Sequence, residues 1–510
     1  MDLFIGVAVF AVVLWYAFLY TRRHEAPRIP VLPSKSILGH MPAPGVTIYE
    51  WLAKASKQYG PVFGIRILFV NMVTVNTAEA MREFFEARSS IYSGRRAPKM
   101  AELAGMSEGV LFQQDPHQLR QGRKFLASGL QPSALKAYQH VLHVHVVHFL
   151  DRVLRAPTKI LTLVPMLPTG IALEIAYGYR LKDEKDPFVQ RARKSVNRFI
   201  QATAMSLEDG FIVNWMPLLS YLPSFLPGMS FKTTAAEWDV WSKANAAEGF
   251  NTVKQDVANG TARPSLLQRA LEDQKGTYDE YLLMRTATQV YSGGSDTTTS
   301  ALKTFVLAMT LYPEAQAKAQ AEIDHHMANK GAGRLPNYAS DRDDLPYVHA
   351  LVREVMRWHM PAPMTTRTAT EDNVYKGYLV KKGTTLVVNM WSILHDEDVF
   401  PDHEVFRPER WLDGTLLAKF DADPLDVAFG FGRRVCPGKY LAIDMLFTAI
   451  VSTLTVFDIR KAKDTAGNDI VPKEEYTNRA IVAPLPFPCV VTARSDAAKQ
   501  LVDNAMSAIA

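Results

Sequence analysis

The sequence predicts a mainly α-helical fold with small β-sheets, because two long helical patterns stand beside two short strand patterns. One helix is expected over about 281–311, where apolar and small residues continue until Pro313. A second is expected over 346–358, a segment that prolines delimit on both sides. Strands are expected at 62–70 and 384–389, which are rich in β-branched residues. Helices should therefore form most of the core.

Composition and length favour a large globular protein. The chain has 510 residues, of which 48% are hydrophobic and 21% charged, and its formal net charge is only +5. No basic run could follow a phosphate backbone, so no nucleic-acid partner is expected. Linkers and repeats are absent beyond the N-terminal region, which predicts one large domain over 41–496 and a C-terminal tail over 497–510. Cys436 and Cys489 allow at most one disulfide, which favours a reducing compartment.

The N-terminus has the pattern of a membrane anchor. Residues 3–20 include no charge, and two arginines follow almost at once. At about 1.5 Å per residue this length is just sufficient for a bilayer core of about 30 Å. We expect residues 1–20 to form a single uncleaved transmembrane helix rather than a shallow interfacial one, with the remainder of the chain in the cytosol. The proline-rich segment 21–40 is expected to be an extended hinge.

The segment 211–228 is rich in large apolar residues but is interrupted by three prolines, so it cannot form one helix. Two interpretations are open. The segment is either a buried irregular part of the core or a patch that dips into the membrane.

Residues 429–438 read Phe-Gly-Phe-Gly-Arg-Arg-Val-Cys-Pro-Gly and suggest a role for Cys436. A nucleophilic cysteine would need a base, and a zinc site would need further cysteine or histidine ligands, but the surrounding sequence offers neither. Haem iron, in contrast, accepts a single protein thiolate. The apolar run 440–457 predicts a helix whose N-terminus would favour a negative sulfur, and Arg434 can reach an anion such as a haem propionate.

This stretch resembles the haem-binding signature of the cytochrome P450 superfamily, the haem-thiolate monooxygenases. The fixed positions of that signature are matched by Phe429, Gly432, Arg434, Cys436 and Gly438. The resemblance covers about residues 25–495 and is greatest to membrane-anchored eukaryotic members such as those of fungi. It implies the P450 fold, with 41–496 as a haem-thiolate catalytic domain, and haem b with Cys436 as the axial ligand of the iron.

Another family motif is expected in the helix over 281–311. The stretch Gly293-Gly-Ser-Asp-Thr-Thr298 resembles the oxygen-activation motif. The resemblance implies that Gly294 lies against the haem and that Asp296 and Thr297 relay protons. Taken alone, the stretch favours an ordinary helical turn whose hydroxyl groups bond back to the preceding carbonyls, and the cysteine motif downstream reverses this preference.

A structural cluster is implied in the same way. Glu354 and Arg357 match the family's Glu-x-x-Arg, and a spacing of three places them on one helix face. Arg410, in Phe-Arg-Pro-Glu-Arg-Trp over 406–411, occupies the position of the arginine that completes a Glu-Arg-Arg cluster. The implied role is to hold the segment before the cysteine loop.

Two further arginines occupy positions where the family contacts haem propionates. Arg367 follows Arg357 by ten residues, and Arg123 ends the stretch Leu-Arg-Gln-Gly-Arg over 119–123. The family usually has Trp-x-x-x-Arg there, and the tryptophan is missing. Arg120 and Lys124 are therefore alternative partners for the propionate.

The resemblance implies a monooxygenase that oxidises a lipophilic small molecule, and a terpenoid, polyketide or aromatic secondary metabolite is the expected substrate. Because the chain lacks a Gly-rich dinucleotide fingerprint, electrons are expected from an NADPH-cytochrome P450 reductase, with cytochrome b5 as a second candidate donor. The expected location is the endoplasmic reticulum membrane. Two alternatives are a haem-thiolate isomerase or dehydratase that needs no oxygen, and a non-catalytic haem- or ligand-binding protein. The pair Asp296 and Thr297 disfavours the isomerase or dehydratase.

Overall fold

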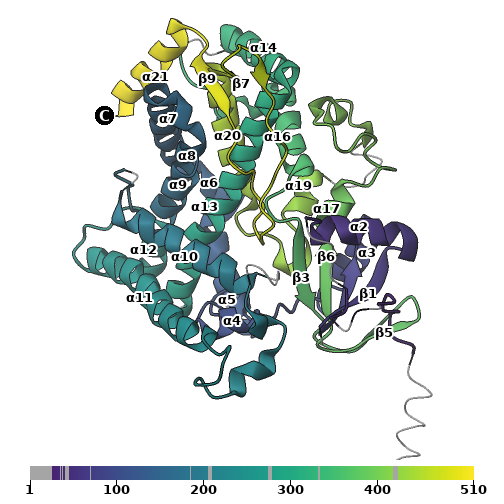
Figure 1. Cartoon of the computed structure of the whole chain (residues 1–510). Helices are drawn as coiled ribbons and strands as arrows, with labels where there is room; N and C mark the ends of the chain where they lie inside the picture. Colours follow the sequence, from purple (N-terminus) through teal and green to yellow (C-terminus); the bar gives the residue numbers. More distant parts are fainter. Residues whose placement is uncertain are drawn as a thin grey trace, which may run out of the picture.

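Helices form most of the molecule, which confirms the predicted class (Figure 1). A computed structural model of the chain describes residues 26–34, 36, 38–40, 45–68, 70–183, 185–204, 210–273, 278–330, 333–416 and 423–509. The predicted anchor over 1–20 and part of the predicted hinge lie outside the described residues.

The core is built around helix α13, Glu280–Leu311, which passes through the centre of the helical part in Figure 1. Asp279 caps its first turn by accepting a hydrogen bond from the Leu282 N–H at 2.7 Å, and the helix ends shortly before Pro313. Helix α16, Pro346–Trp358, is capped from outside, because Glu322 accepts hydrogen bonds from the N–H groups of Tyr347 and Val348. Both predicted helices are confirmed.

Helix α20, Lys439–Val456, is apolar on all sides because other helices surround it. Among the described residues it is the one helix that is long and apolar enough to cross a bilayer. The bent helix pair Pro157–Leu163 and Met166–Tyr177 would be a second candidate if it is counted as one span. Of its residues, 83% are buried inside the protein, and α7, α13, α14 and α16 pack against it. This helix therefore belongs to the core.

A four-stranded sheet with the order β1-β2-β6-β3 lies at the lower right of Figure 1. Its strands are β1 (Val62–Ile67), β2 (Val70–Val75), β6 (Thr385–Asn389) and β3 (Met364–Thr368). The strand predicted at 384–389 is confirmed, but the prediction of one strand over 62–70 was wrong at its C-terminal end. The chain reverses at Leu68, where φ is 51°, so that β2 can pair antiparallel with β1. Strand β3 carries Arg367 beside β6.

The remaining elements surround this core. The longer helices are α5 (Pro116–Leu130), α7 (Gln139–Arg155), α9 (Met166–Tyr177), α10 (Pro187–Thr203), α11 (Phe231–Ala258), α14 (Pro313–Lys330) and α21 (Asp496–Ile509). The shorter ones are α2 (Ile48–Tyr59), α3 (Ala78–Arg82), α4 (Lys99–Leu103), α6 (Pro132–Leu135), α8 (Ile160–Leu163), α12 (Leu266–Glu272), α15 (Tyr338–Asp341), α17 (Met390–Leu394) and α19 (Pro424–Ala428). Two small sheets contain β4 (Asn373–Tyr375) with β5 (Tyr378–Val380), and β7 (Phe457–Lys463) with β8 (Asp469–Ile470) and β9 (Cys489–Ala493).

Both ends of the described chain are attached to the fold. Near the N-terminus, Pro30 accepts a backbone hydrogen bond from Gly64 at 2.7 Å, and Pro27 accepts one from Leu379 at 2.7 Å. The hinge role of this region stays a prediction. At the C-terminus, α21 packs against α7 and buries Ala498 and Val502.

The segment 211–228 is buried in part of its first half and exposed in its second half, and its contact with a membrane stays a prediction. It forms two short 3₁₀ helices, η4 (Ile212–Asn214) and η5 (Pro217–Tyr221). Val213 in η4 is buried in the core. Leu218, Tyr221 and Phe225, in contrast, are 78%, 80% and 83% exposed. The second half is thus an apolar surface patch.

Candidate functional site

Cys436 lies in a tight loop directly before α20. Its backbone N–H donates to the Phe429 carbonyl at 2.9 Å, and Gly438 is the N-cap residue of the helix. Gly432 has a φ of 59°, and a Cβ there would lie 2.0 Å from the Phe85 carbonyl oxygen. No other residue fits this turn. The loop therefore holds the sulfur at the positive end of a helix.

The surroundings of the sulfur both penalise and support a negative charge. Burial raises the pKa of the Cys436 thiol, whereas the Gly438 N–H and the positive charges of Arg123, Arg95 and Lys439 act to lower it. A Cβ on Gly438 would approach only the Cys436 Sγ, at 4.0 Å. Because Gly438 has no side chain, it leaves the space beside the Cys436 sulfur free.

Helix α13 presents a second open surface near Gly293. The Thr297 hydroxyl donates to the Gly293 carbonyl at 2.7 Å, and a Cβ on Gly293 would meet no atom within 4 Å. A Cβ on Gly294 would instead meet Ala172 of α9 at 3.6 Å. The structure therefore gives Gly293, which sequence reasoning did not select, the open position beside Thr297. The sequence prediction paired Thr297 with Gly294, three residues before it, whereas the hydrogen bond pairs Thr297 with Gly293, four residues before it. The role predicted for Gly294 stays a prediction.

Asp296 precedes Thr297 and is partly buried. Burial raises the pKa of its carboxyl group, and the positive charges of Lys303 and Arg193 oppose this rise. The carboxyl group therefore holds a proton at higher pH than an exposed aspartate does.

Of the three basic residues considered at the end of 119–124, Arg123 is the one at the cysteine loop. Its Nη1 donates to the Val435 carbonyl, next to Cys436, at 3.1 Å. Arg120 and Lys124 are exposed, and Lys124 lies over the ring of Tyr278, 6.0 Å from its centroid. The geometry favours Arg123 over both alternatives.

Arg367 and Arg434 approach the same region from different elements. Arg367 on β3 donates through Nη1 to the Thr365 hydroxyl and the Thr366 carbonyl, both at 2.9 Å. Arg434 donates to the backbone carbonyls of Ser93 at 2.8 Å, Val110 at 2.9 Å and Gln113. Arg434 therefore connects the cysteine loop to the segment 93–113.

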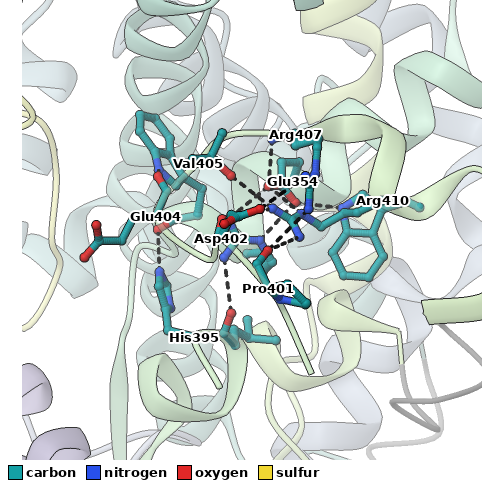
Figure 2. A network of polar contacts seen from close by, with 12 residues as sticks. Glu354, His395, Pro401, Asp402, Glu404, Val405, Arg407 and Arg410 are labelled. Carbon is teal, nitrogen blue, oxygen red and sulfur yellow. Dashed lines mark hydrogen bonds and ion pairs between the residues drawn. The ribbon is translucent and has the colours of Figure 1, made fainter. Parts of the chain in front are cut away.

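Glu354, Arg357 and Arg410 form a buried cluster around the Glu354 carboxylate (Figure 2). Arg357 donates to both carboxylate oxygens, at 3.0 and 2.9 Å, and Arg410 Nε donates to Oε1 at 3.0 Å. The Trp411 indole N–H adds a bond to Oε2 at 2.8 Å, and the Arg407 N–H adds one to Oε1 at 3.0 Å. The contacts join α16 to the segment that leads to the cysteine loop.

Sequence reasoning missed Arg95, which belongs to none of the motifs. Its Nη2 donates to the Thr365 hydroxyl at 3.0 Å and its Nε to the Thr366 carbonyl at 3.3 Å. Burial, together with the charges of Arg434 and Arg123, lowers the pKa of Arg95 to about 10, although Cys436 opposes this change. The sequence Arg95-Arg96 gave no indication of which arginine points inward.

These residues fit a flat, dianionic, iron-bearing group such as haem b. Cys436 offers one sulfur ligand, and the Cβ positions of Gly293 and Gly438 are uncrowded, with no atom within 4 Å at Gly293 and only the Cys436 Sγ, at 4.0 Å, at Gly438. Arg95, Arg123, Arg367 and Arg434 form no ion pair with a carboxylate in the described part of the chain. Within those residues no cluster of three or more His, Cys, Asp or Glu side chains can hold a metal ion, whereas haem needs only one protein thiolate.

Comparison with known proteins identifies the family. The family model described as cytochrome P450 matches residues 29–486. The chain belongs to this family. It is 35% identical over 507 residues to cytochrome P450 monooxygenase 208 of Postia placenta, covering 98% of this chain and 96% of that protein. It is also 35% identical to cytochrome P450 monooxygenase claR of Ampulloclitocybe clavipes, covering 89% of this chain and 84% of the relative.

Solved structures agree on the P450 fold. A zebra fish cytochrome P450 with progesterone has a TM-score of 0.72 at 21% identity, and it covers 88% of this chain and 100% of its own. Another zebra fish P450 structure, with abiraterone, has a TM-score of 0.67 with the same identity and coverage. Family membership and the fungal relatives together make the protein a P450 monooxygenase, an oxidoreductase that uses thiolate-ligated haem b. The isomerase, dehydratase and non-catalytic alternatives are therefore not favoured.

Proposed function

We propose that Cys436 is the axial ligand of the haem iron and that Asp296 and Thr297 deliver protons during oxygen activation. The observation that carries this proposal is the cysteine in a tight loop at the N-terminus of α20, and the Thr297 hydroxyl beside Gly293, where a Cβ would meet no atom within 4 Å, supports it. Haem supplies the redox chemistry when it is bound. The remaining steps can be assigned to residues of this chain.

The Thr297 hydroxyl donates its proton in a hydrogen bond to the Gly293 carbonyl, so its oxygen can accept a hydrogen bond from a water molecule and orient it. Asp296 lies one residue earlier on another helix face, where the charges of Lys303 and Arg193 act on its carboxyl group. Because its pKa is raised by burial, Asp296 can pass a proton from outside towards Thr297. The propionates are bound by Arg123, Arg367 and Arg434. The loop around Cys436 is shaped by Phe429, Gly432 and Gly438. Gly294 allows α13 to lie close to the haem.

Two measurements test this assignment. The reduced protein with carbon monoxide should show the red-shifted Soret band of thiolate ligation, and its absence would contradict the role of Cys436. Thr297→Ala should keep this band but release more peroxide for each NADPH consumed. Thr297→Ser should restore coupling, and Thr298→Ala, whose side chain is buried one position further along, is the matched control. Unchanged coupling in Thr297→Ala would exclude the proton-delivery role.

The proposed substrate is a lipophilic secondary metabolite, such as a terpenoid, polyketide or aromatic compound. Support comes from the exposed apolar patch at Leu218, Tyr221 and Phe225 and from the similarity to fungal monooxygenases. A library of such compounds can be screened for substrate-induced shifts of the haem spectrum. Uniform failure across these classes, with a response only to polar metabolites, would overturn the proposal.

The proposed electron donor is an NADPH-cytochrome P450 reductase, with cytochrome b5 as a second donor. Arg433 is exposed near the cysteine loop and is available to an acidic partner, whereas Lys439 already pairs with Asp426. Arg433→Glu should therefore raise the reductase concentration needed for half-maximal turnover, and more so at low ionic strength. Turnover supported equally well by a bacterial ferredoxin system and by the reductase would argue against the assignment.

We further propose that residues 1–20 anchor the protein in the endoplasmic reticulum membrane, that 21–40 act as a hinge, and that the catalytic domain faces the cytosol. Asn259-Gly-Thr261 is an exposed glycosylation sequence at the end of α11 and provides a natural reporter. In eukaryotic cells it should remain unmodified, while a long N-terminal tag that carries such a sequence should be glycosylated. Modification of Asn259, abolished by Asn259→Gln, would place the domain in the lumen.

A further inference from the structure

Three residues of helix α13 form one stripe near the middle of the helix. Gln289, Gly293 and Thr297 are spaced by four residues and therefore lie on the same side of the helix. The helix passes through the centre of the helical part, yet Gly293 is exposed and Gln289 and Thr297 are only partly buried (Figure 1). Tyr291, on another side of the same turn, is 1% exposed. The stripe is thus the side of α13 that the packed core leaves uncovered.

The side-chain amide of Gln289 is oriented by the loop 105–111. Its Oε1 accepts a hydrogen bond from the Leu111 N–H at 3.2 Å. Its Nε2 lies against Gly109, because a Cβ on that glycine would approach this nitrogen to 2.5 Å. Gly109 also has a φ of 124°, a conformation that side chains rarely adopt. The glycine therefore makes room for the amide nitrogen, while the Leu111 bond holds the oxygen.

The amide nitrogen of Gln289 keeps its donors free. A side-chain amide carries two N–H donors, and within the described part of the chain the bond from Leu111 is the one hydrogen bond of this side chain. Arg285, one turn earlier, is buried and donates to the Gly105 carbonyl and the Ser242 carbonyl, so that it attaches the same loop to α13. A partly buried donor without an acceptor is unfavourable. A ligand that supplies an acceptor at this point would therefore be stabilised.

The loop 105–111 also reaches the cysteine loop. Arg434, two residues before Cys436, donates to the Val110 carbonyl at 2.9 Å. The Gln289 amide is therefore held between α13 and a loop that is tied to the proposed haem site. Two spacings of four residues, at about 1.5 Å of rise per residue, separate Gln289 from Thr297 by about 12 Å along the helix.

We propose that Gln289 is a specificity-determining residue that donates a hydrogen bond to an acceptor oxygen of the substrate. The substrate is then a lipophilic molecule that carries a carbonyl, hydroxyl or ether oxygen about 12 Å from the carbon that is oxidised. This inference rests on the proposed oxidation beside Thr297 and narrows the proposed substrate class. Pure hydrocarbons are disfavoured, because they would cover the amide donors without pairing them.

Two substitutions separate the free donors from the loop contact. Gln289→Glu keeps an oxygen for the Leu111 N–H but replaces the amide nitrogen by a second oxygen, which cannot donate when the carboxyl group is ionised. Gln289→Leu removes both functions. Thr288→Val is the matched control, because the Thr288 hydroxyl points to another side of the helix, where it donates to the Met284 carbonyl at 3.0 Å and lies 3.3 Å from the Tyr177 hydroxyl.

The probes are N-alkylimidazoles of increasing chain length, each made with a terminal methyl ketone and with a terminal isopropenyl group. The two end groups have nearly the same shape, but the ketone alone offers an oxygen acceptor. Because the imidazole nitrogen binds haem iron and shifts its spectrum, the dissociation constant of each probe can be measured without knowledge of the natural substrate. The titrations use the full-length holoprotein at about pH 8, where a glutamate is ionised. Each variant is first checked for the carbon monoxide band.

At the chain length that reaches Gln289, the wild type should bind the ketone about fivefold more tightly than the isopropenyl compound, as expected for one neutral hydrogen bond. Thr288→Val should keep this preference, whereas Gln289→Glu and Gln289→Leu should lose it. A role of Gln289 in holding the loop alone would weaken both probes equally. A wild type without a preference at any length, or a preference that survives in Gln289→Glu, would overturn the inference.

The same titrations separate this inference from the haem site on which it rests. Spectral shifts with every imidazole, but no preference for the ketone, would refute the role of Gln289 and leave the haem site standing. The absence of any spectral shift, in protein that also lacks the carbon monoxide band, would refute the haem site and this inference with it.

Discussion

The Glu354 cluster leads to a quantitative prediction, because the chain contains its own control. The Trp411 indole N–H donates to the Glu354 carboxylate at 2.8 Å, and the Trp358 indole N–H donates to the Glu404 backbone carbonyl at the same distance. Both rings are buried, at 5% and 1% exposure. Phenylalanine keeps the six-membered ring and removes the same atoms at each site. The two substitutions therefore differ mainly in the acceptor that loses its donor.

A hydrogen bond to a charged group contributes about 1.5–3 kcal/mol, and one to a neutral carbonyl about 0.5–1.5 kcal/mol. Trp411→Phe should consequently destabilise the protein by about 1 kcal/mol more than Trp358→Phe. Urea unfolding of both holoproteins, followed by far-ultraviolet circular dichroism, gives the two free energies of unfolding. An equal loss, or a larger loss in Trp358→Phe, would refute the argument that the carboxylate strengthens the Trp411 bond.

Glu354→Gln should be far more severe than either substitution. It removes the only charge that compensates Arg357 and Arg410 within this cluster, and breaking a buried pair costs about 3–5 kcal/mol. Little folded holoprotein should accumulate, as measured by the carbon monoxide band in cell extracts. A normal yield would show that the cluster does not limit folding.

Three further predictions follow from other parts of the structure. Burial raises the pKa of Asp444, so this residue contributes stability at low pH that is lost as pH rises through its folded-state pKa. The free energy of unfolding of Asp444→Asn, measured by urea titration, should therefore rise relative to that of the wild type from about pH 4 to about pH 7. A difference that stays constant with pH would contradict this. Gly432→Ala should abolish the carbon monoxide band because the added Cβ would collide with the Phe85 carbonyl. Gly260→Ala, where φ is also positive but the Cβ would lie in open space, should retain the band. Similar spectra for both variants would show that the collision at Gly432 does not prevent haem binding. In a chain that begins at residue 26, serine at Leu218, Tyr221 and Phe225 should reduce co-sedimentation with lipid vesicles, whereas serine at Val240, which is 69% exposed outside the patch, should not. No reduction would exclude the patch as a membrane contact.

Sequence patterns located the helices and the cysteine loop because these depend on local chemistry. Proline boundaries and long apolar runs define α13 and α16, and glycine is required wherever a Cβ cannot fit, as at Gly432. The break at Leu68 was missed because the β-branched run continues across it. Only pairing between β1 and β2 shows where the chain turns.

The contents of the candidate site were predicted unevenly for the same reason. Cys436 and Arg434 belong to one continuous motif and could be identified from it. Arg95 could not, because its neighbour Arg96 has the same chemistry, and only the fold decides which side chain reaches Thr365. Gly293 was not selected because spacing alone does not show which of the two adjacent glycines faces α9. The structure directs Gly294 towards Ala172 of α9 and leaves Gly293 in the open position.

The sequence by itself determined the mainly helical class, the cysteine at a helix start and the residues of the Glu354 cluster, since each belongs to a local pattern of residue types. The tertiary structure alone decided which distant groups meet. It brought β3, the segment 93–113 and the cysteine loop together, so that Arg95, Arg123, Arg367 and Arg434 converge on one region. Such convergence depends on chain topology and burial, which no local pattern records.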